Sequence, residues 1–512
     1  MTTSEVGQET VAAGPSSSVE VNARASARAE TRMLIGGRLL DADDSFENVS
    51  PATGHVLGTT SAGTARDMDA AIASARSAFD ESPWSTDRSL RRRCLTQLQE
   101  ALEAEREDIR DELIAEAGAP VMTTQIAQLE WPLADSLRYP IGLIDTFGWE
   151  RELDGGGIGG ADNGRVVWKE PTGVVGAITP WNFPFEIILN KLAQALATGN
   201  TMVLKPDPNT PWTATRIGRL VADRTEIPAG VFNVVPTQDN SVAELLVADP
   251  RVDMISFTGS TAVGRSIAST AAQSLKRVFL ELGGKSALVV LDDADLDQAI
   301  PLMAGVCMHA GQGCGINTRA VVPRNRFDET VNKISDLFAM IRPGDPALPE
   351  TFLGPVINRK QRDRIGDILD RARSDGAVIS GGTPPTDLPD YLSGGNYLLP
   401  AIVTGIENSA EIAQLEVFGP VLVVIAHDGE DDAIRISNDT PYGLSGTVCT
   451  SSTERGLAFA RKIRSGTMAV NGSTYYGADA PFGGYKQSGL GRQNGLEGFE
   501  QYLQTKAVGY PR

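Results

Sequence analysis

The sequence predicts an α/β fold in which a largely parallel sheet carries helices on both faces. Short apolar segments alternate with segments of helical periodicity from residue 174 to residue 309, and only brief turns separate them. Strands that are apolar along most of their length are typical of a parallel sheet buried on both faces. A chain of 512 residues leaves room for about three domains.

The N-terminal region is expected to contain a tail, a hairpin and helices. Residues 1–32 are rich in Ser, Ala and Glu and poor in large apolar side chains, which predicts a disordered tail. Met33–Ile35 precedes two glycines, a pair typical of a hairpin turn. Ala, Leu and charged residues at helical spacing from 65 to 116 predict helices, which Pro83 must interrupt.

The regular alternation begins after a glycine-rich loop at 153–163 and a short strand at 166–168. Strands are then expected at 174–179, 201–205, 231–235, 254–257 and 278–282, and helices at 185–197, 214–223, 242–247 and 262–272. A second α/β domain is indicated by a strand at 287–291, a helix at 296–309, and further elements at 421–425, 431–437, 445–449, 454–463 and 467–470.

Composition excludes several classes of function. The chain carries 65 Asp and Glu against 46 Lys and Arg, a net charge of −19, which disfavours nucleic acid and anionic membranes as partners. No stretch approaches the length of a membrane-spanning helix. Three His leave little material for a zinc site, so no metal is expected. Four Cys in so long a chain do not make a disulfide scaffold, which favours a reducing compartment, the cytoplasm.

Cys314 is the candidate nucleophile. It lies between Gly313 and Gly315 at the end of a helical pattern, and these glycines leave the thiol accessible to a substrate. A free cysteine is more often a small buried apolar residue, so the local sequence supports both interpretations equally. Cys307, two helical turns earlier, is expected to pack in the core.

Two further polar residues end apolar strands. Glu281 stands directly before Leu282-Gly283-Gly284, where desolvation would raise its pKa and suit it to act as a general base; the alternative is an ion pair with Lys285. Asn182 lies in a turn fixed by two prolines. There it would donate to a developing oxyanion, or it would form an Asx-type turn, which the local sequence favours.

Residues 257–266 open a helix after a strand and nearly fit the phosphate-binding G-x-x-x-x-G-K-[ST] pattern. Arg265 replaces the lysine, and its guanidinium is a poor substitute for a compact ammonium, so a nucleotide triphosphatase is only weakly indicated. The N-terminus of this helix still favours a pyrophosphate.

Taken together, these motifs resemble the aldehyde dehydrogenase superfamily. They are PWNFP at 180–184, LELGGK at 280–285, GQGC at 311–314, EVFGP at 416–420 and PFGGYK at 481–486, in that family's order and at closely similar spacing. The resemblance extends from about residue 33 to residue 512, and the motifs are far more specific together than singly.

The resemblance implies oxidation of an aldehyde to its carboxylic acid. Cys314 would attack the aldehyde to give a thiohemiacetal, with Asn182 and the Cys314 backbone N–H holding the oxyanion. Hydride transfer to a nicotinamide leaves a thioester, which water activated by Glu281 hydrolyses; this base argues against transfer to coenzyme A. Lys191 matches a lysine linked to proton relay, whereas Gln493 stands where a relay glutamate is common.

The same resemblance implies a nicotinamide cofactor, NAD or NADP. The expected cofactor-binding residues are Thr179, Pro180, Trp181, Lys205, Gly259, Ser260, Gly264, Leu282, Glu416 and Phe418. Lys205 matches the contact to the adenine ribose, and Ser260 matches the contact to the pyrophosphate. Pro208 stands where NAD-preferring members usually carry Glu, which leaves NAD only slightly favoured.

The residues that match the substrate tunnel are Phe183, Gly313, Gly315, Thr474 and Tyr476. No Arg or Lys flanks the nucleophile to hold a second carboxylate. We therefore expect a medium or bulky aldehyde, aromatic or aliphatic, rather than succinic semialdehyde.

The resemblance also implies three interleaved parts. A Rossmann-like NAD(P)-binding domain would take 33–148 and 172–283, and an α/β catalytic domain 284–486. Residues 149–171 and 487–512 would form a small β bridging unit that adds strands to a neighbouring subunit, giving a homodimer or homotetramer. Unpartnered, an edge such as Val166–Trp168 would favour aggregation.

Two alternatives stand against this reading of the site. The same Cys and Glu would also serve a cofactor-independent thiol esterase, and a catalytically idle scaffold would keep the fold without the chemistry. Both are disfavoured, because the nucleophile, the base, the oxyanion amide and the cofactor residues are all present.

Overall fold

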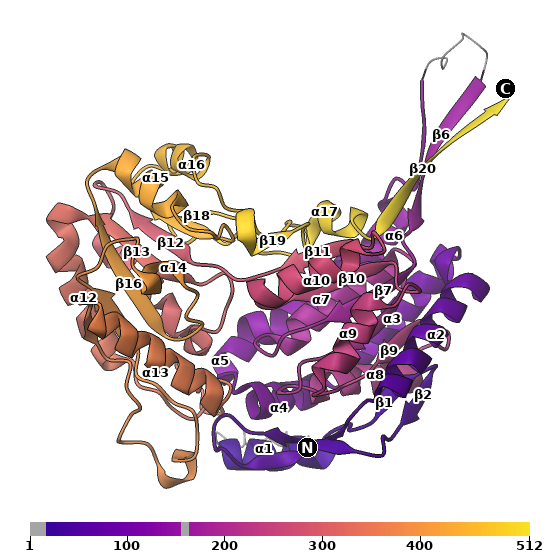
Figure 1. Ribbon diagram of the computed structural model, residues 1–512, viewed down its shortest axis with the longest axis horizontal. Coiled ribbons are helices and arrows are strands. Elements are labelled where there is room, and N and C mark those ends of the chain that lie inside the picture. The colour runs from indigo at the N-terminus through magenta and orange to yellow at the C-terminus, as the bar shows by residue number, and fades with distance from the viewer. Residues whose placement is uncertain (1–16, 155–162, 512) are drawn as a thin grey trace, which may run out of the picture.

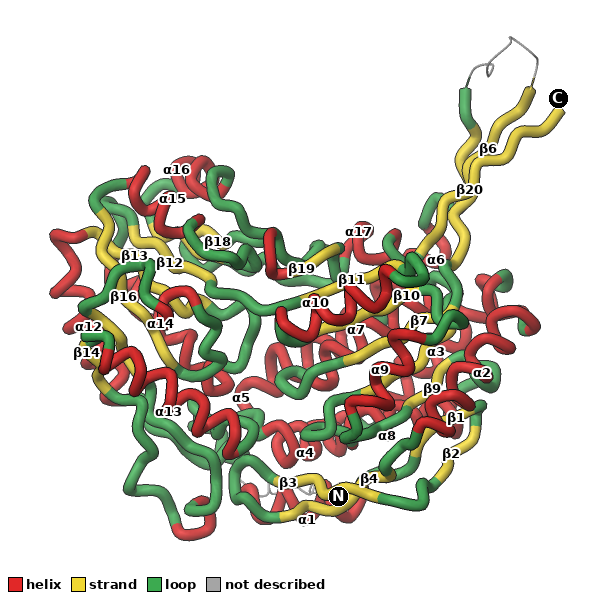
Figure 2. Tube along the Cα trace, in the orientation of Figure 1, coloured by secondary structure: helices red, strands yellow, loops and turns green. Residues whose placement is uncertain are grey.

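The computed structural model describes residues 17–154 and 163–511. The chain forms two lobes, each built around its own sheet, and a long β arm projects from one of them (Figure 1). In both lobes helices lie on the two faces of the sheet, as the alternating pattern predicts (Figure 2).

The first lobe contains an eight-stranded sheet in the order β19-β11-β10-β7-β8-β9-β1-β2, in which β19 (Gly489–Leu490) is an antiparallel edge strand. Its parallel centre consists of β11 (Arg277–Glu281), β10 (Met254–Thr258), β7 (Val174–Ile178), β8 (Thr201–Lys205) and β9 (Phe232–Val234). One face packs against α3 (Arg88–Ala104), α7 (Pro184–Ala197) and α8 (Trp212–Arg224), and the other against α2 (Ala65–Glu81), α9 (Asn240–Ala248) and α10 (Thr261–Ala272). The strands and helices expected from 174 to 282 are confirmed.

The expected hairpin forms the antiparallel edge of this sheet. β1 (Met33–Ile35) pairs with β2 (Arg38–Leu40), and Gly36 and Gly37 between them have φ values of 58° and 76°. Both angles lie in the left-handed region, which only glycine adopts without strain. Pro83 interrupts the helical region between α2 and α3, as expected.

The second lobe contains a seven-stranded sheet in the order β14-β15-β16-β13-β12-β17-β18. Its strands are β12 (Ser286–Val290), β13 (Asn317–Pro323), β14 (Val378–Ser380), β15 (Ala401–Thr404), β16 (Val421–His427), β17 (Gly446–Cys449) and β18 (Ala469–Val470). α11 (Leu296–Met303) and α12 (Phe327–Met340) cover one face; α13 (Arg359–Ser374), α15 (Glu430–Asn438) and α16 (Thr453–Ala460) cover the other. Sequence patterns missed β13, β14, β15, α12 and α13.

The expected helix at 296–309 is too long. α11 ends at Met303, and a 3₁₀ segment (Ala304–Gly311) follows in which His309 and Ala310 adopt left-handed φ values of 47° and 53°. Gly311 continues this turn with a φ of 72°. Only glycine fits here, because a Cβ would lie 2.1 Å from the carbonyl oxygen of Gly419. The helical pattern of the sequence gives no sign of this turn, which directs the chain back toward the first lobe.

The expected disordered tail is wrong for residues 17–32; residues 1–16 lie outside the described part of the chain. α1 (Ser18–Arg28) packs on α4 (Arg106–Ala117) through buried Val21 and Ala25. Such a narrow stripe of small side chains is hard to distinguish from a disordered composition.

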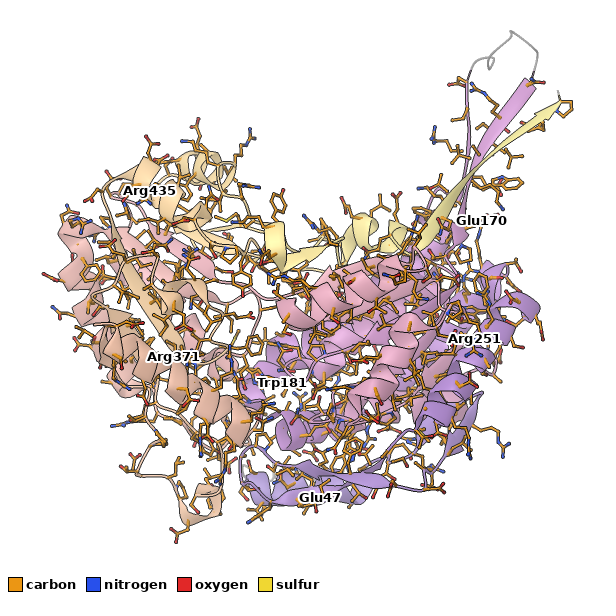
Figure 3. The ribbon with its side chains drawn as sticks, in the orientation of Figure 1. Glu47, Glu170, Trp181, Arg251, Arg371 and Arg435 are labelled. Atoms are coloured by element: carbon orange, nitrogen blue, oxygen red, sulfur yellow. The ribbon has the colours of Figure 1, made fainter. Side chains whose placement is uncertain are left out.

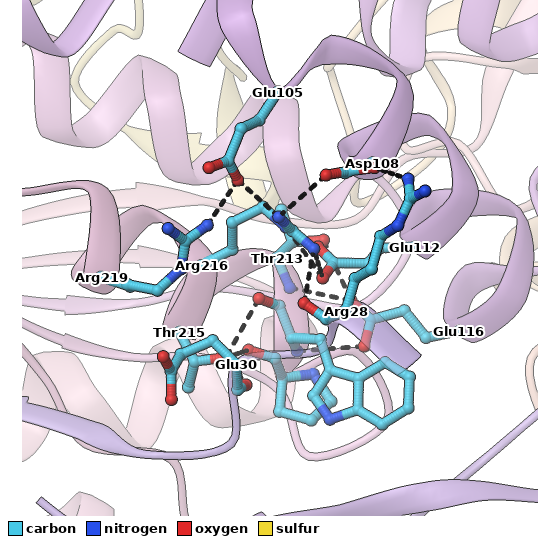
Figure 4. Close-up of polar contacts among 12 residues, drawn as sticks. Arg28, Glu30, Glu105, Asp108, Glu112, Glu116, Thr213, Thr215, Arg216 and Arg219 are labelled. Atoms are coloured by element: carbon cyan, nitrogen blue, oxygen red, sulfur yellow. Dashed lines mark hydrogen bonds and ion pairs between the residues drawn. The ribbon is translucent and has the colours of Figure 1, made fainter. Parts of the chain in front are cut away.

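Buried polar contacts hold α1 in place. Ser18 donates to Asp345 of the second lobe, and the Arg28 carbonyl accepts from Arg216 at 3.0 Å. Arg216 also pairs with Glu105 and Glu112 (Figure 4). The N-terminal helix therefore fastens to both lobes.

The arm is a three-stranded antiparallel sheet in the order β20-β6-β5. Its strands are β5 (Glu150–Glu152), β6 (Asn163–Pro171) and β20 (Leu503–Pro511). Residues 166–168 are paired on both sides, so the expectation of an edge strand there is wrong: β20 returns from the C-terminus to cover it. Most of the expected glycine-rich loop, 155–162, lies outside the described residues. In the described ranges no helix has the length and apolar character needed to cross a membrane.

Candidate active site

The site lies where four parallel strands of the first sheet end. Register pairs Ile178 with Lys205, Ile178 with Phe257, and Thr258 with Glu281, so the carboxyl ends of β8, β7, β10 and β11 meet at one edge. Ligands of open α/β sheets bind in the crevice outside this edge. The motifs that follow these strands are therefore brought together although they are far apart in sequence.

The lobes enclose a cavity of about 280 Å³ at this edge. Trp181, which lines it, lies between the two lobes (Figure 3). Ten expected site residues line the cavity: Pro180, Trp181, Asn182, Gly259, Ser260, Glu281, Leu282, Cys314, Glu416 and Phe418. Thr258, Gly283, Gln361 and Arg364 complete its lining. The structure thus joins the candidate nucleophile, base and amide with most of the expected cofactor residues.

Cys314 lies in the loop between the 3₁₀ segment and β13 and is half-buried. Burial raises the pKa of its thiol well above the usual value, and the carboxyls of Glu281 and Glu416 raise it further. A thiol in this environment needs a base to form the nucleophilic thiolate. Cys307 is fully buried in the core of the second lobe, as expected.

Glu281 ends β11 and is 3% exposed. Neither carboxylate oxygen has a hydrogen-bond partner in the part of the chain that the structure describes. Desolvation raises the pKa of Glu281 well above its usual value, and nearby Lys191 only partly opposes this. The ion pair with Lys285 considered from the sequence is not formed, and Lys285 is itself buried without a hydrogen bond to any described residue. A buried carboxylate in this state can take a proton from water.

Asn182 is fixed against the nucleophile loop. Its Nδ2 donates to the Gln312 carbonyl at 2.8 Å, and its own carbonyl accepts from Gln128 Nε2 at 2.7 Å. Gln312 is held in turn, because its Oε1 accepts from the Ile357 amide at 2.8 Å. The side-chain amide of Asn182 therefore contacts the residue two positions before Cys314 and is held rigidly there, as an oxyanion donor requires.

Lys191 on α7 is completely buried. Its Nζ donates to Ser256 Oγ at 3.1 Å and lies 4.5 Å from the centre of the Phe279 ring. Ser256 Oγ lies 2.9 Å from the Tyr502 hydroxyl. Burial lowers the pKa of Lys191 to about 7, although Glu281 and Glu186 oppose the change. An amine with this pKa can exchange protons near neutrality.

Several of the expected cofactor residues are held by contacts within the chain. Ser260 caps α10, its Oγ accepting from the Val263 amide at 3.3 Å. Glu416 Oε1 accepts from the Gly284 amide at 2.9 Å, and the Phe418 ring meets Trp181 edge-on at 5.4 Å.

Thr179, Lys205 and Gly264 are expected cofactor residues that do not line the cavity. Thr179 directly follows β7 and Lys205 ends β8, both at the same edge of the sheet. Gly264 is small because a Cβ there would come within 2.5 Å of Leu282.

Sequence patterns missed the residues of α13 that hold the loop at 416–418. Gln361 donates to the Phe418 carbonyl at 2.8 Å, and Arg364 donates to the carbonyls of Val417 and Glu416 at 2.7 and 2.9 Å. The basic amphipathic pattern of 359–374 was a usable signal for this helix, but nothing in it pointed to the site.

Of the expected substrate residues, Gly313 and Gly315 flank Cys314, and Phe183 and Tyr476 form an aromatic wall beside it together with Phe482. A Cβ on Gly313 would lie 3.7 Å from the Phe183 ring, and one on Gly315 would lie 3.7 Å from the Phe482 ring. Tyr476 packs on Phe482 with ring centres 5.0 Å apart. Thr474 is exposed and stands outside this wall. Among the described residues, no group of three or more His, Cys, Asp or Glu is placed to hold a metal ion.

A thiol, a free buried carboxylate and a fixed amide beside a sheet edge and a helix N-terminus define a thiol-dependent dehydrogenase. The model of the aldehyde dehydrogenase family matches residues 40–508, and the chain belongs to that family. Membership of this family confirms the oxidation of an aldehyde that was expected from the sequence.

Individual relatives are similar over nearly the whole chain. 3-Succinoylsemialdehyde-pyridine dehydrogenase from a Pseudomonas species is 40% identical over 474 residues, which cover 90% of this chain and 94% of that protein. An aldehyde dehydrogenase of Mycobacterium tuberculosis complexed with NAD+ superposes with a TM-score of 0.88 at 38% identity, covering 93% of this chain and 97% of the other. A mutant of aldehyde dehydrogenase C from Pseudomonas syringae, complexed with NAD+ and octanal, gives 0.88 at 35%, covering 94% and 96%.

Proposed function

We propose that Cys314, Glu281 and Asn182 carry out NAD-dependent oxidation of an aldehyde to a carboxylic acid in three assigned roles: nucleophile, general base and oxyanion donor. The observation that carries the assignment is Glu281, whose two buried oxygens accept no hydrogen bond from the described chain while its side chain lines the same cavity as Cys314. Buried polar groups are usually hydrogen-bonded, so a carboxylate without a partner on either oxygen in a cavity is a candidate for a functional role.

The residues around the cavity fit a nicotinamide dinucleotide. α10 is a 12-residue helix whose N-terminus borders the cavity at Ser260, which suits a pyrophosphate. Gly283 leaves space for the Glu416 carboxylate, since a Cβ there would lie 2.2 Å from Glu416 Oε2. Glu416 would bind the nicotinamide ribose, Phe418 the ring and Lys205 the adenine ribose. When bound, the cofactor would accept the hydride.

The first covalent step joins Cys314 Sγ to the aldehyde carbon. The thiol proton passes to a base, either Glu281 or a water molecule beside it, and the carbonyl π pair moves to oxygen. Asn182 Nδ2 and the Cys314 backbone N–H donate to that oxygen, where negative charge develops. Loss of the aldehyde hydrogen as hydride then leaves a thioester on Cys314.

Hydrolysis of the thioester depends on Glu281. Glu281 first releases to solvent any proton that it took from the thiol. The carboxylate then removes a proton from water, whose oxygen attacks the acyl carbon, and as the C–S bond breaks Glu281 gives this proton to Cys314 Sγ. Lys191 lies close enough to lower the pKa of Glu281, and it would pass protons onward. Gln493 cannot ionise, so the relay of protons falls to the chain's other buried groups.

NADP is proposed as a second acceptor. Pro208 lines a cavity of about 350 Å³ with Asn209, Gln238 and Arg359. A proline cannot hold the ribose 2′-hydroxyl as a glutamate would, and it carries no charge to repel a 2′-phosphate. NAD remains the preferred cofactor of the proposal, supported by the NAD+ complexes of similar structures.

The remaining proposals concern substrate, assembly and location. A medium or bulky aldehyde fits the glycines that flank Cys314 and the aromatic wall beside them. The arm, β5, β6 and β20, projects away from both lobes and is proposed to join subunits in a homodimer or homotetramer (Figure 1). All four cysteines are free, which supports a reducing compartment such as the cytoplasm.

The test mixes pure protein with NAD or NADP and a simple aldehyde such as benzaldehyde. Reduced cofactor should appear, and Cys314→Ala should abolish it while leaving the thermal unfolding transition in place. Cleavage of para-nitrophenyl acetate without cofactor reduction from any aldehyde would instead support the thiol esterase.

A further inference from the structure

A second buried carboxyl lies beside the nucleophile and has no part in the steps above. Glu186, in the first turn of α7, is 6% exposed. Its Oε1 accepts hydrogen bonds from the Tyr476 hydroxyl and from Asn190 Nδ2. Both donors therefore converge on a single oxygen of the carboxylate.

The other acceptors of this group are left unused. Glu186 Oε2 accepts no hydrogen bond from the residues that the structure describes, and it forms no ion pair with them. Asn190 is 1% exposed, and its Oδ1 is buried without a partner in the same described ranges. Asn190 Oδ1 is thus a buried acceptor without a donor, which costs free energy unless a ligand supplies an N–H or O–H group, and Glu186 Oε2 is a neighbouring acceptor that no described residue fills.

This group belongs to the wall that leads to Cys314. The Tyr476 ring packs edge-on against Phe482 at 5.0 Å and against Trp131 at 4.9 Å. Phe482 in turn lies 3.7 Å from the position that a Cβ on Gly315 would take, directly after the nucleophile. Glu186 is also close enough to raise the pKa of the Cys314 thiol. An aldehyde held at Cys314 thus extends along a wall that carries these acceptors.

We propose that Glu186 and Asn190 select aldehydes that carry a hydroxyl or amino hydrogen-bond donor several atoms from the carbonyl, and discriminate against aldehydes that carry a carboxylate there. This selectivity rests on the proposed oxidation at Cys314 and names its substrate class. The donor of the substrate fills the acceptors that the chain leaves open. An anionic group would meet the Glu186 charge instead.

The charge balance around Glu186 favours this chemistry. Desolvation raises the pKa of Glu186 to about 7, and Tyr476, Lys191 and Asn190 oppose the shift. Lys191 is the nearby amine; its Nζ donates to Ser256 rather than to Glu186, and with a pKa of about 7 it is largely uncharged at pH 8. Glu416, whose pKa burial raises to about 7, adds further negative charge on the cavity side at pH 8. At pH 8 the wall therefore presents an acceptor and a negative charge to a substrate.

The experiment compares three aldehydes of similar size that do not cyclise. They are para-methylbenzaldehyde, para-(hydroxymethyl)benzaldehyde and para-formylbenzoate, each with its meta isomer to cover the unknown depth of the wall. Initial rates at pH 8 with saturating NAD give kcat/KM for each. We expect the hydroxymethyl compound to exceed the methyl compound by about tenfold in at least one isomer series, the factor typical of a hydrogen bond to a charged acceptor. The carboxylate should be the poorest of the three.

Glu186→Gln keeps the shape of the side chain and removes its charge. In this variant the ratio of kcat/KM for para-formylbenzoate to that for the methyl compound should rise about tenfold, and the preference for the hydroxymethyl compound should shrink. Glu454→Gln on the exposed surface of α16 removes one charge from the protein elsewhere and should leave both ratios unchanged.

The two proposals fail in different ways. Equal rates on methyl and hydroxymethyl aldehydes in the wild type, or ratios that Glu186→Gln does not alter, would overturn the inference while oxidation itself stands. Absence of cofactor reduction with every aldehyde would overturn the proposed function. Turnover of para-methylbenzaldehyde by Glu186→Gln reports that the variant is folded.

Discussion

Two buried glutamates in this molecule have almost the same exposure and opposite surroundings. Glu112 on α4 is 0% exposed. Its Oε1 accepts from two nitrogens of Arg216 on α8, Nη2 at 2.7 Å and Nε at 2.9 Å. Glu281 is 3% exposed, and its oxygens accept from none of the described residues. Each has a buried cation nearby, but only Arg216 is in direct contact with its carboxylate.

The difference lies in where the cation is held. Arg216 on α8 contacts Glu112, Glu105 and the Arg28 carbonyl. Its charge therefore links α8 to α1, to α4 and to the residue that precedes α4. Lys191 is held away from Glu281 by Ser256 and the Phe279 ring. A carboxylate with a bound guanidinium is structural, whereas one whose cation is withheld keeps its oxygens available for a proton.

Glu281→Gln tests the functional half of this comparison and should have the largest effect. The amide cannot take a proton from water, so kcat for aldehyde oxidation should fall about 10²- to 10⁴-fold. The thioester should then accumulate on Cys314, as measured by intact-protein mass after quenching. Stability should be unchanged or higher, because a buried unpaired charge is removed. A variant with near-normal kcat would contradict the assignment of Glu281 as base.

Arg216→Met tests the structural half. It leaves Glu112 buried without its partner, so at pH 8 the carboxyl must either stay charged and unpaired or take up a proton; this should lower the free energy of unfolding of the first lobe by about 3–5 kcal/mol. Urea denaturation followed by tryptophan fluorescence measures the change, and kcat below the transition should stay near normal. The double variant Arg216→Met/Glu112→Gln should recover part of the loss. A loss no larger than that of an exposed arginine would show that the cluster is not structural.

Asn182→Ala should have a somewhat smaller effect on catalysis. Removal of one oxyanion donor typically lowers kcat about 10²- to 10³-fold, while the Cys314 backbone N–H remains. KM for the aldehyde should change much less than kcat, since the bond strengthens only as charge develops on oxygen. Single-turnover kinetics with excess enzyme measures the step directly. If the thioester forms at the wild-type rate, the amide only supports the Gln312 loop.

The same contrast explains how far the sequence could predict the molecule. Local sequence alone left Cys314 balanced between nucleophile and core residue and favoured an Asx-type turn for Asn182; the roles proposed for Cys314, Glu281 and Asn182 come from the set of motifs that resembles the family. Glu186 was not predicted, because it lies inside a helix that otherwise reads as apolar core. Gln361 and Arg364 act through the backbone of a distant loop, a relation that depends on tertiary packing alone. α1 was missed because its interface consists of small residues and of buried charges supplied by α4 and α8.

The pH dependence of stability gives the smallest expected effect. Burial raises the pKa of Glu112 to about 7, although Arg216 lowers it, against a usual value of 4.5 in the unfolded chain. The folded state therefore binds more protons than the unfolded state between these values. The stability contributed by this group is complete below pH 4.5 and is lost as pH rises through about 7, at no more than about 1.4 kcal/mol per pH unit for one proton. The difference in unfolding free energy between the wild type and Glu112→Gln should thus change across pH 5 to 8. Since Glu186 and Glu416 titrate in both proteins, they cancel in this difference, and a constant difference would mean that Arg216 keeps Glu112 ionised throughout.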